Sequence, residues 1–323
     1  MDCKGLKEIN LPEQGKFYRL KNGASGWYAT SDLRTGEAQH ANKFYMSENG
    51  TQANTIWYVG ANNALLSYKK GQYLGDMSSD WSFEAIGSEG NTTTFVQGAT
   101  VGKIQIKPSS GRSLYGDNIR VDAAGEGNNS GNYEWVIEEV TSLPVAVSAA
   151  GYATLYAPVA LTLPAELTAY TVSVSGDWAT LEQIEGNVIP ANTGVVLEGA
   201  EGSYNLTVGG DAEEIEGNSL LGSVAASYVT DNAYVLGYVN EEVGFYTAKM
   251  TEGKWLNNGF KAYLPKSVNG ARFISFDFGT ETAIDELKGE NGNVKTVIYD
   301  LAGRRVQGAQ KGIFIVNGKR VIK

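Results

Sequence analysis

The sequence predicts an all-β protein, and three observations support this prediction. Tyrosine and tryptophan, which favour strands, number 18 and 6, and 40 glycines against only 7 prolines supply many turns. Short stretches alternate between apolar and polar residues and break at Gly, Asn or Pro. A helical period of useful length is missing, apart from a short run at 283–287. The 323 residues are enough for two or three domains.

Residues 15–140, which follow an N-terminal extension at 1–14, carry a threefold repeat of short strands. Each repeat starts with one strand type: "KFYRLKN", "ALLSYKK" or "KIQIKPS". A glycine-led strand follows ("SGWYATS", "GQYLGD", "GRSLYGD"), and the repeat continues with large residues two apart ("TIWYV", "WSFEAI", "YEWVIEEV"). Aligned in this way, Tyr28, Tyr73 and Tyr115 fall roughly together, as do Trp57, Phe83 and Trp135, although the gaps between the two sets differ (29, 10 and 20 residues). Three such repeats over about 125 residues predict a β-trefoil.

This segment resembles the ricin-B-like trefoils, which carry a Gln-x-Trp in each repeat. The matching positions here read Thr55-x-Trp57, Trp81-x-Phe83 and Tyr133-x-Trp135. The large core residue is therefore kept in each repeat, whereas the glutamine is replaced in all three. The resemblance implies a trefoil fold and a lectin-like activity.

Residues 141–279 have the texture of a central antiparallel β-sandwich. Stretches such as "VAVSAAGYATLYAPVALTL" and "TGVVLEGAEGSYNLTV" alternate with a period of two and break at turn residues. The stretch "AYVLGYVNEEVGFYTAKM" predicts a hairpin that closes around Asn240, Glu241 and Glu242. Regularly spaced short strands of this kind are typical of sandwiches.

A polar linker at 280–293 leads to a C-terminal module at 294–323, in which we expect three strands. Asn317-Gly318 suits a two-residue type I′ turn, because both residues tolerate positive φ. That turn pairs Val316 with Lys319, Ile315 with Arg320, Phe314 with Val321 and Ile313 with Ile322. About 30 residues are too few for a core of their own, so the module must dock on the sandwich or stay mobile.

The C-terminal module closely resembles the sorting domains of the type IX secretion system. The residues and stretches that carry the match are Tyr299, Asp300, Leu301, Gly303, Arg304, Lys311, Gly312, Ile313, Phe314 and the run Gly318, Lys319, Arg320, Val321, Ile322 and Lys323. The preceding sandwich, with "GYATLYAP", "IPANTGVVLEG" and "KAYLP", also looks like the β-domain that often precedes such tails. The resemblance implies export machinery as a partner and a secreted or outer-membrane surface location. It also implies that the chain can be part of a larger exported protein.

Charge is distributed unevenly along the chain. The net charge is −10, but residues 291–323 hold seven Lys and Arg against one acidic residue, Asp300, so this segment carries +6 and the rest −16. The acidic whole argues against nucleic acid as a partner. A basic hairpin could also dock on the acidic sandwich, and Lys and Arg protect exposed sheet edges from mispairing.

Other classes of partner and location are also excluded. No stretch approaches eighteen uninterrupted apolar residues, so we expect no transmembrane segment. The first twenty residues contain no apolar h-region, so no signal peptide is expected in this sequence.

Catalytic and metal chemistry have few candidate residues. Cys3 and His40 are the single cysteine and histidine, so disulfides, Cys–His metal pairs and a conventional nucleophilic triad are not expected. The loop 116–129 offers acidic oxygens, yet it lacks the order of an EF-hand loop. Acids such as Asp177 or Glu182 could in principle form a glycosidase pair, but nothing sets them apart. We therefore predict a protein that is not an enzyme and needs no cofactor or metal.

The best candidates for a ligand site are aromatic residues and the polar residues near them. Sugar rings present apolar C–H faces that stack on exposed aromatic side chains. Trp27 and Trp81 occupy positions at which the other repeats carry different residues, so they are the candidate platforms, although core packing is the alternative role. The polar candidates after the glycine-led strands are Asp32, Asp76, Asp117 and Asn118.

The sequence thus favours an exported, non-catalytic binding module, with a glycan as the expected ligand. The alternative is a structural spacer that forms the C-terminal part of a larger exported enzyme such as a glycoside hydrolase. A hydrolase in its own right would require two acidic residues that converge in a cleft.

Overall fold

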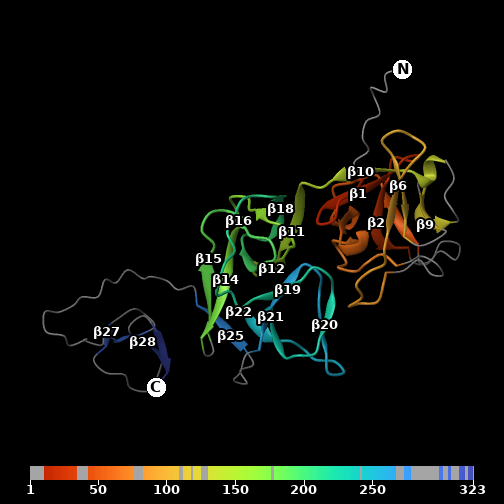
Figure 1. Cartoon of the computed structure of the whole chain (residues 1–323). Coiled ribbons are helices and arrows are strands. Elements are labelled where there is room, and N and C mark those ends of the chain that lie inside the picture. The colour runs from red at the N-terminus through yellow and green to blue at the C-terminus, as the bar shows by residue number, and fades with distance from the viewer. Residues whose placement is uncertain are drawn as a thin grey trace. The chain divides into compact units, whose positions relative to one another are not determined.

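The computed structural model describes residues 11–34, 43–75, 83–108, 112–117, 119–124, 130–175, 178–240, 242–266, 273–277, 298–300, 305–306, 313–316 and 319–322. It confirms the all-β class, because strands dominate and the helical elements in these ranges are the 3₁₀ turns η1 (Ala53–Thr55), η2 (Ala61–Asn63) and η3 (Gly131–Tyr133). The chain divides into two compact units, Met1–Asp277 and Phe278–Lys323 (Figure 1). Within the described ranges, no helix has the length and apolar character needed to cross a membrane.

Three successive repeats make up the N-terminal part of the first unit. The first contains β1 (Phe17–Asn22), β2 (Tyr28–Leu33), β3 (Phe44–Ser47) and β4 (Ile56–Val59). The second contains β5 (Leu65–Ser67), a single bridge between Leu74 and Phe83, and β6 (Thr94–Gln97). The third contains β7 (Ile104–Lys107), β8 (Ser113–Gly116), β9 (Arg120–Ala124) and β10 (Trp135–Glu139).

The pairing of these strands is that of a β-trefoil. The first and last strands of the repeats pair antiparallel in the order β6-β7-β10-β1-β4-β5, which makes the barrel. The middle strands form hairpins: β2 with β3, Leu74 with Phe83, and β8 with β9. The trefoil expected from the threefold repeat is therefore confirmed.

Two tryptophans occupy equivalent core positions in the first and third repeats. Trp57 is 2% exposed and donates a hydrogen bond from Nε1 to the carbonyl oxygen of Ala29 at 3.3 Å. Trp135 is fully buried and donates in the same way to the carbonyl oxygen of Leu114 at 2.9 Å. These bonds place Ala29 level with Leu114. The predicted alignment of Tyr28 with Tyr115 is therefore wrong by two residues.

The second repeat fills the same core position with Phe95 on β6, so the predicted assignment of Phe83 is wrong. Phe95 is buried and pairs with Ile106, whereas Phe83 is bridged to Leu74 in the middle hairpin. Phe83 and Phe95 are both large residues that follow the glycine-led strand of the second repeat, and their distance along the chain from Tyr73 distinguishes them. Phe95 lies 22 residues after Tyr73, close to the spacings of 29 and 20 residues predicted for the other two repeats, whereas Phe83 lies only 10 residues after it.

The central part of the first unit holds the sandwich. Its strands are β11 (Ser142–Val147), β12 (Tyr152–Tyr156), β13 (Leu161–Thr162), β14 (Thr168–Ser175), β15 (Trp178–Gln183), β16 (Val188–Ile189), β17 (Gly194–Glu198), β18 (Gly202–Val208), β19 (Leu221–Ser223), β20 (Ser227–Val229), β21 (Ala233–Val239), β22 (Glu242–Thr247), β23 (Trp255–Asn257), β24 (Lys261–Pro265) and β25 (Phe273–Asp277). They form the sheets β11-β18-β13-β16 and β12-β17-β14-β15-β25-β22-β21-β24-β19, together with the pair β20-β23. The pairings are antiparallel, except that β15 runs parallel to β25.

Strand β17 of the larger sheet is buried on both faces. Val195 and Leu197 pack in the cluster shared with the four-stranded sheet, and Val196 packs in a second cluster with Phe245 and Ile274. Successive side chains of a strand point to opposite faces, so an apolar run such as "GVVLE" serves two cores at once. The predicted hairpin is confirmed, but Glu242, which was expected in its turn, is the first residue of β22 and pairs with Val239.

The trefoil and the sandwich share one apolar cluster. Alternation along β1 sends Tyr18 into the trefoil core and Phe17 into this shared cluster. The ring of Phe17 lies 5.9 Å from that of Phe260, and the ring of Tyr68 lies 4.8 Å from it. Because both segments belong to one compact unit, the domain boundary between 140 and 141 stays a prediction.

The second unit contains β26 (Ile298–Asp300), β27 (Arg305–Val306), β28 (Ile313–Val316) and β29 (Lys319–Ile322), paired in the order β27-β26-β28-β29. The predicted register is confirmed at all four pairs, from Val316 with Lys319 to Ile313 with Ile322. Three strands were expected, and the extra strand is β27, whose two residues are too short for a period-two pattern. Of the residues that carry the sorting-domain resemblance, Tyr299 and Asp300 lie in β26 and Lys319 lies in β29. The described residues do not include the linker at 280–293 with its run at 283–287, nor Gly303, Arg304, Lys311, Gly312, Gly318 and Lys323.

Candidate functional site

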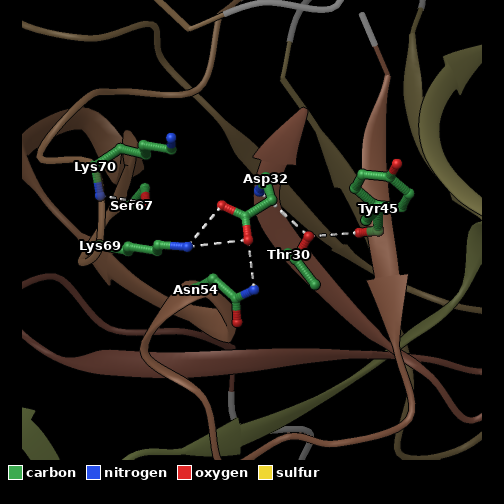
Figure 2. Close-up of polar contacts among 7 residues, drawn as sticks. All are labelled: Thr30, Asp32, Tyr45, Asn54, Ser67, Lys69 and Lys70. Carbon is green, nitrogen blue, oxygen red and sulfur yellow. Dashed lines mark hydrogen bonds and ion pairs between the residues drawn. The ribbon is translucent and has the colours of Figure 1, made fainter. Parts of the chain in front are cut away.

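The first trefoil repeat assembles a polar site around Asp32, the second-last residue of β2 (Figure 2). Asn54 in η1 donates from Nδ2 to Asp32 Oδ2 at 2.8 Å. Lys69, in the turn after β5, donates from Nζ to Oδ1 at 3.0 Å and to Oδ2 at 3.1 Å. The three groups therefore come from the second strand, the 3₁₀ turn before the fourth strand and the start of the second repeat.

The Asp32 carboxylate is accessible and is held in its charged form. Its side chain is 32% exposed and that of Lys69 is 47% exposed, so solvent or a ligand reaches both. Partial burial by itself would raise the pKa of Asp32. The hydrogen bonds from Asn54 and Lys69, together with the positive charges of Lys69 and Lys70, outweigh the effect of burial, so the pKa of this carboxyl lies below its usual value.

An exposed aromatic ring lies next to this arrangement on β3. The Thr30 hydroxyl donates to the Tyr45 carbonyl oxygen at 2.8 Å and accepts from the Asp32 backbone N–H at 3.3 Å. In Figure 2 the Asp32 carboxylate points toward Lys69 and Asn54, and Tyr45 lies on the other side of Thr30. The Tyr45 side chain points outward at 40% exposure, between the buried Phe44 and Met46.

A buried arginine supports the Tyr45 ring. The Arg34 guanidinium lies 4.9 Å from the centroid of the ring, which is the distance of a cation–π contact. Arg34 is only 8% exposed, and its Nη1 donates to the Ile119 carbonyl oxygen at 2.7 Å. Arg34 is thereby fixed, so it stabilises the position of the Tyr45 ring.

The third repeat has equivalent residues that make different contacts. Asp117 follows Leu114 by three residues, as Asp32 follows Ala29, but its Oδ1 accepts from the Ile119 backbone N–H at 2.6 Å. Asn132 precedes Trp135 by three residues, as Asn54 precedes Trp57, but its Nδ2 donates to the Tyr115 hydroxyl at 2.9 Å. Within the described ranges, the carboxylate–amide–ammonium arrangement is formed in the first repeat.

Of the other candidate residues, Trp27 is described and does not join this site. Trp27 is half-buried, packs against the trefoil core and precedes Asp32 by five residues. Its predicted role as an exposed platform stays a prediction. Trp81, Asp76 and Asn118 lie outside the described residues.

The described residues also contain no group of three or more His, Cys, Asp or Glu side chains that could hold a metal ion. In the loop at 116–129, which was considered for calcium, Asp117 binds the backbone of Ile119.

Sequence reasoning missed Asn54, Lys69 and Tyr45. For Asn54 a signal existed, because asparagine stands three residues before tryptophan in both the first and the third repeats. For Tyr45 the run "FYM" is apolar throughout, so period-two alternation could not tell which residue faces outward. Lys69 had no local signal, because its contact with Asp32 spans 37 residues.

Comparisons with known proteins return no family model and no curated protein that matches. Solved structures that match include a ricin B-like lectin from Macrolepiota procera in complex with lactose, at 17% identity over 41% of this chain and 100% of the lectin, with a TM-score of 0.32. The BEL β-trefoil in an apo crystal form matches at 17% identity over 41% of this chain and 97% of its own, with a TM-score of 0.33. Cry35Ab1 matches at 9% identity over 79% of this chain and 88% of its own, with a TM-score of 0.30. Similarity at this level carries no argument, so the trefoil assignment rests on the strand pairing above.

Proposed function

We propose that this chain is a non-catalytic carbohydrate-binding protein and that its first trefoil repeat holds a glycan site. One observation carries the proposal: an exposed carboxylate, Asp32, lies between an amide and an ammonium group, beside an exposed tyrosine. Sugar hydroxyls donate to a carboxylate and accept from amide and ammonium N–H groups. The C–H face of a sugar ring stacks on an aromatic side chain. The site therefore offers both kinds of contact that a glycan needs.

The ion pair between Lys69 and Asp32 should affect how this site binds a glycan. In the free protein its ammonium is bound to Asp32, so a sugar hydroxyl that approaches the carboxylate meets an ion pair. Salt weakens such exposed pairs. We expect glycan affinity to depend on ionic strength, because ligand and Lys69 share the same two oxygens.

The test is a glycan-array screen of the whole chain, followed by variants. The Asp32→Ala and Tyr45→Ala variants should lose binding to the glycans that the natural protein retains. Asp117→Ala is the matched control, because it removes the equivalent carboxylate in the third repeat. Trp27→Ala examines the aromatic residue named from the sequence. Equal binding by the natural protein and the Asp32→Ala variant would exclude the site, and no binding by the folded natural protein would exclude the function.

A second candidate function is that of a structural spacer in a larger exported protein. The shared apolar cluster favours it, because the ring contacts of Phe260 with Phe17 and Tyr68 join trefoil and sandwich firmly. The encoding gene separates the two functions: a catalytic domain encoded upstream of residue 1 would favour the spacer.

We also propose that the tail at 294–323 directs export, so that the protein is secreted or displayed at the outer-membrane surface. The support is the sorting-domain resemblance together with the hairpin register of β28 and β29. To test the role of the tail, the full chain and a variant that lacks residues 294–323 are expressed in a bacterium with a type IX secretion system. The full chain should reach the surface or the medium, and the truncated chain should remain inside. Equal export of both chains would show that the tail does not direct export.

A further inference from the structure

A cavity of about 510 Å³ lies in the sandwich, far from the trefoil site in sequence. It opens where two strands separate. The pairing of β21 with β24 stops at Tyr234 with Leu264, and the next residues of both strands, including Leu236 and Lys261, line the cavity. Residues of β11, β12, β23 and the segment after β22 also line it. Its volume is that of pockets which hold small molecules.

The lining is cationic although the protein is acidic. Lys261 and Lys249 line the cavity, and none of the lining residues, all of which are described, is Asp or Glu. The Lys261 Nζ donates to the Thr154 carbonyl oxygen at 3.1 Å, and no carboxylate among the described residues pairs with it. Burial lowers the pKa of Lys261, as expected for an ammonium group without a counter-ion. An ammonium has three donors, so two remain for a ligand.

The walls combine apolar and polar surface and are firmly held. Trp255 is 6% exposed, donates from Nε1 to the Asp231 carbonyl oxygen at 3.1 Å, and stacks edge-on against Tyr263 at 5.0 Å. Asn257, which is 3% exposed, donates to Ser223 Oγ at 2.8 Å and to the Lys261 carbonyl oxygen at 3.3 Å. These bonds fix β23 against β24, so the cavity exists before a ligand enters.

We propose that this cavity binds a small carboxylate with an apolar or aromatic body, and that the carboxylate is held by Lys261 Nζ. A single ammonium group suits a monoanion. The site offers neither an arginine fork nor a helix N-terminus, the features that commonly hold a phosphate dianion. Trp255 and Leu236 supply the surface that an apolar body would cover. This site is independent of the glycan site, since no residue is shared.

The experiment is an NMR titration of the full chain with benzoate as the probe and benzamide as its neutral match. Benzoate should bind at least tenfold more tightly than benzamide, with intermolecular contacts between its ring protons and the Trp255 indole. In the Lys261→Met variant, benzoate affinity should fall at least tenfold and equal that of benzamide. Lys70→Met is the matched control, because its side chain is exposed and does not line the cavity, and it should change affinity less than threefold.

Three outcomes would overturn the proposal. The first is equal affinity of the natural protein for benzoate and benzamide, and the second is unchanged benzoate affinity in Lys261→Met. The third, which needs no variant, is the absence of ring contacts with Trp255. A titration with glucuronate shows whether an acidic sugar fits instead. Tighter binding of glucuronate than of benzoate would also refute the proposal that the ligand has an apolar body.

Discussion

The backbones of Gly71 and Gly259 touch where the trefoil meets the sandwich. A Cβ atom added at Gly71 would lie 2.5 Å from the Cα of Gly259, which is closer than real Cβ atoms approach. Gly71 also has a φ of +63°, and its carbonyl oxygen accepts from the Ala226 backbone N–H at 2.6 Å. Two glycines are thus needed for the close contact between these segments.

Replacement of Gly71 by alanine should destabilise the protein by about 2–4 kcal/mol, because a positive φ and a steric clash add together. Urea unfolding measures the change. Gly102→Ala is the matched control: its φ is +82°, but an added Cβ meets nothing within 4 Å. The control should cost about 1–2 kcal/mol, which is the backbone effect alone. Equal losses in the two variants would show that the contact with Gly259 contributes nothing.

Trp57→Phe should lower the free energy of unfolding by about 1–3 kcal/mol. The variant removes the Nε1 donor and leaves the buried Ala29 carbonyl oxygen without it, and it also leaves a small cavity. Phenylalanine is acceptable there in principle, since Phe95 fills the equivalent position of the second repeat. Trp27→Phe, at a half-buried residue, should cost less, and thermal or urea unfolding compares the two. A larger loss from Trp27→Phe would contradict the core assignment.

The pKa of Asp32, measured by NMR, should lie below the usual value of about 3.9. A carboxyl whose pKa is lowered by folding contributes stability above its unfolded pKa, and this contribution is lost as the pH falls through the folded pKa. Lys69→Met should raise the pKa of Asp32, because it removes two hydrogen bonds and a nearby charge. Lys70→Met is the control, since Lys70 acts on Asp32 only through its charge. A larger shift from Lys70→Met would be inconsistent with the ion pair.

Tyr68→Phe should be less stable than the natural protein by about 1 kcal/mol at pH 7, because the hydroxyl donates to the Pro144 carbonyl oxygen at 2.9 Å. Burial raises the pKa of Tyr68 in the folded state. The unfolded tyrosine therefore ionises first, and the natural protein loses stability as the pH rises above about 10. The difference between variant and natural protein should shrink at that pH.

Urea midpoints at pH 7 and pH 10.5 measure this effect of Tyr68. Tyr228→Phe is the control variant for Tyr68→Phe, because the Tyr228 side chain is 48% exposed whereas the Tyr68 hydroxyl is buried. A difference that stays constant or grows at high pH would contradict the burial of the Tyr68 hydroxyl.

The sequence by itself determined those features of the fold that depend on residues close together in the chain. Period-two alternation predicted the all-β class, and the Asn317-Gly318 pair predicted the register of β28 and β29. Both rules depend on residues close in the chain, where sterics leave few choices. The threefold repeat indicated the trefoil, because its strand types recur in order. The position of Asp32 at the end of a glycine-led strand was also visible.

Only the tertiary structure decided which distant residues meet. Phe95 rather than Phe83 fills the core, because that choice depends on which strand completes the barrel. The side-chain partners of Asp32 come from η1 and the turn after β5, and no local rule specifies a contact across 37 residues such as that with Lys69. The cavity at Lys261 exists because β21 and β24 separate after two pairs. Packing between strands far apart in the chain determines such positions, and local preference in the sequence does not encode them.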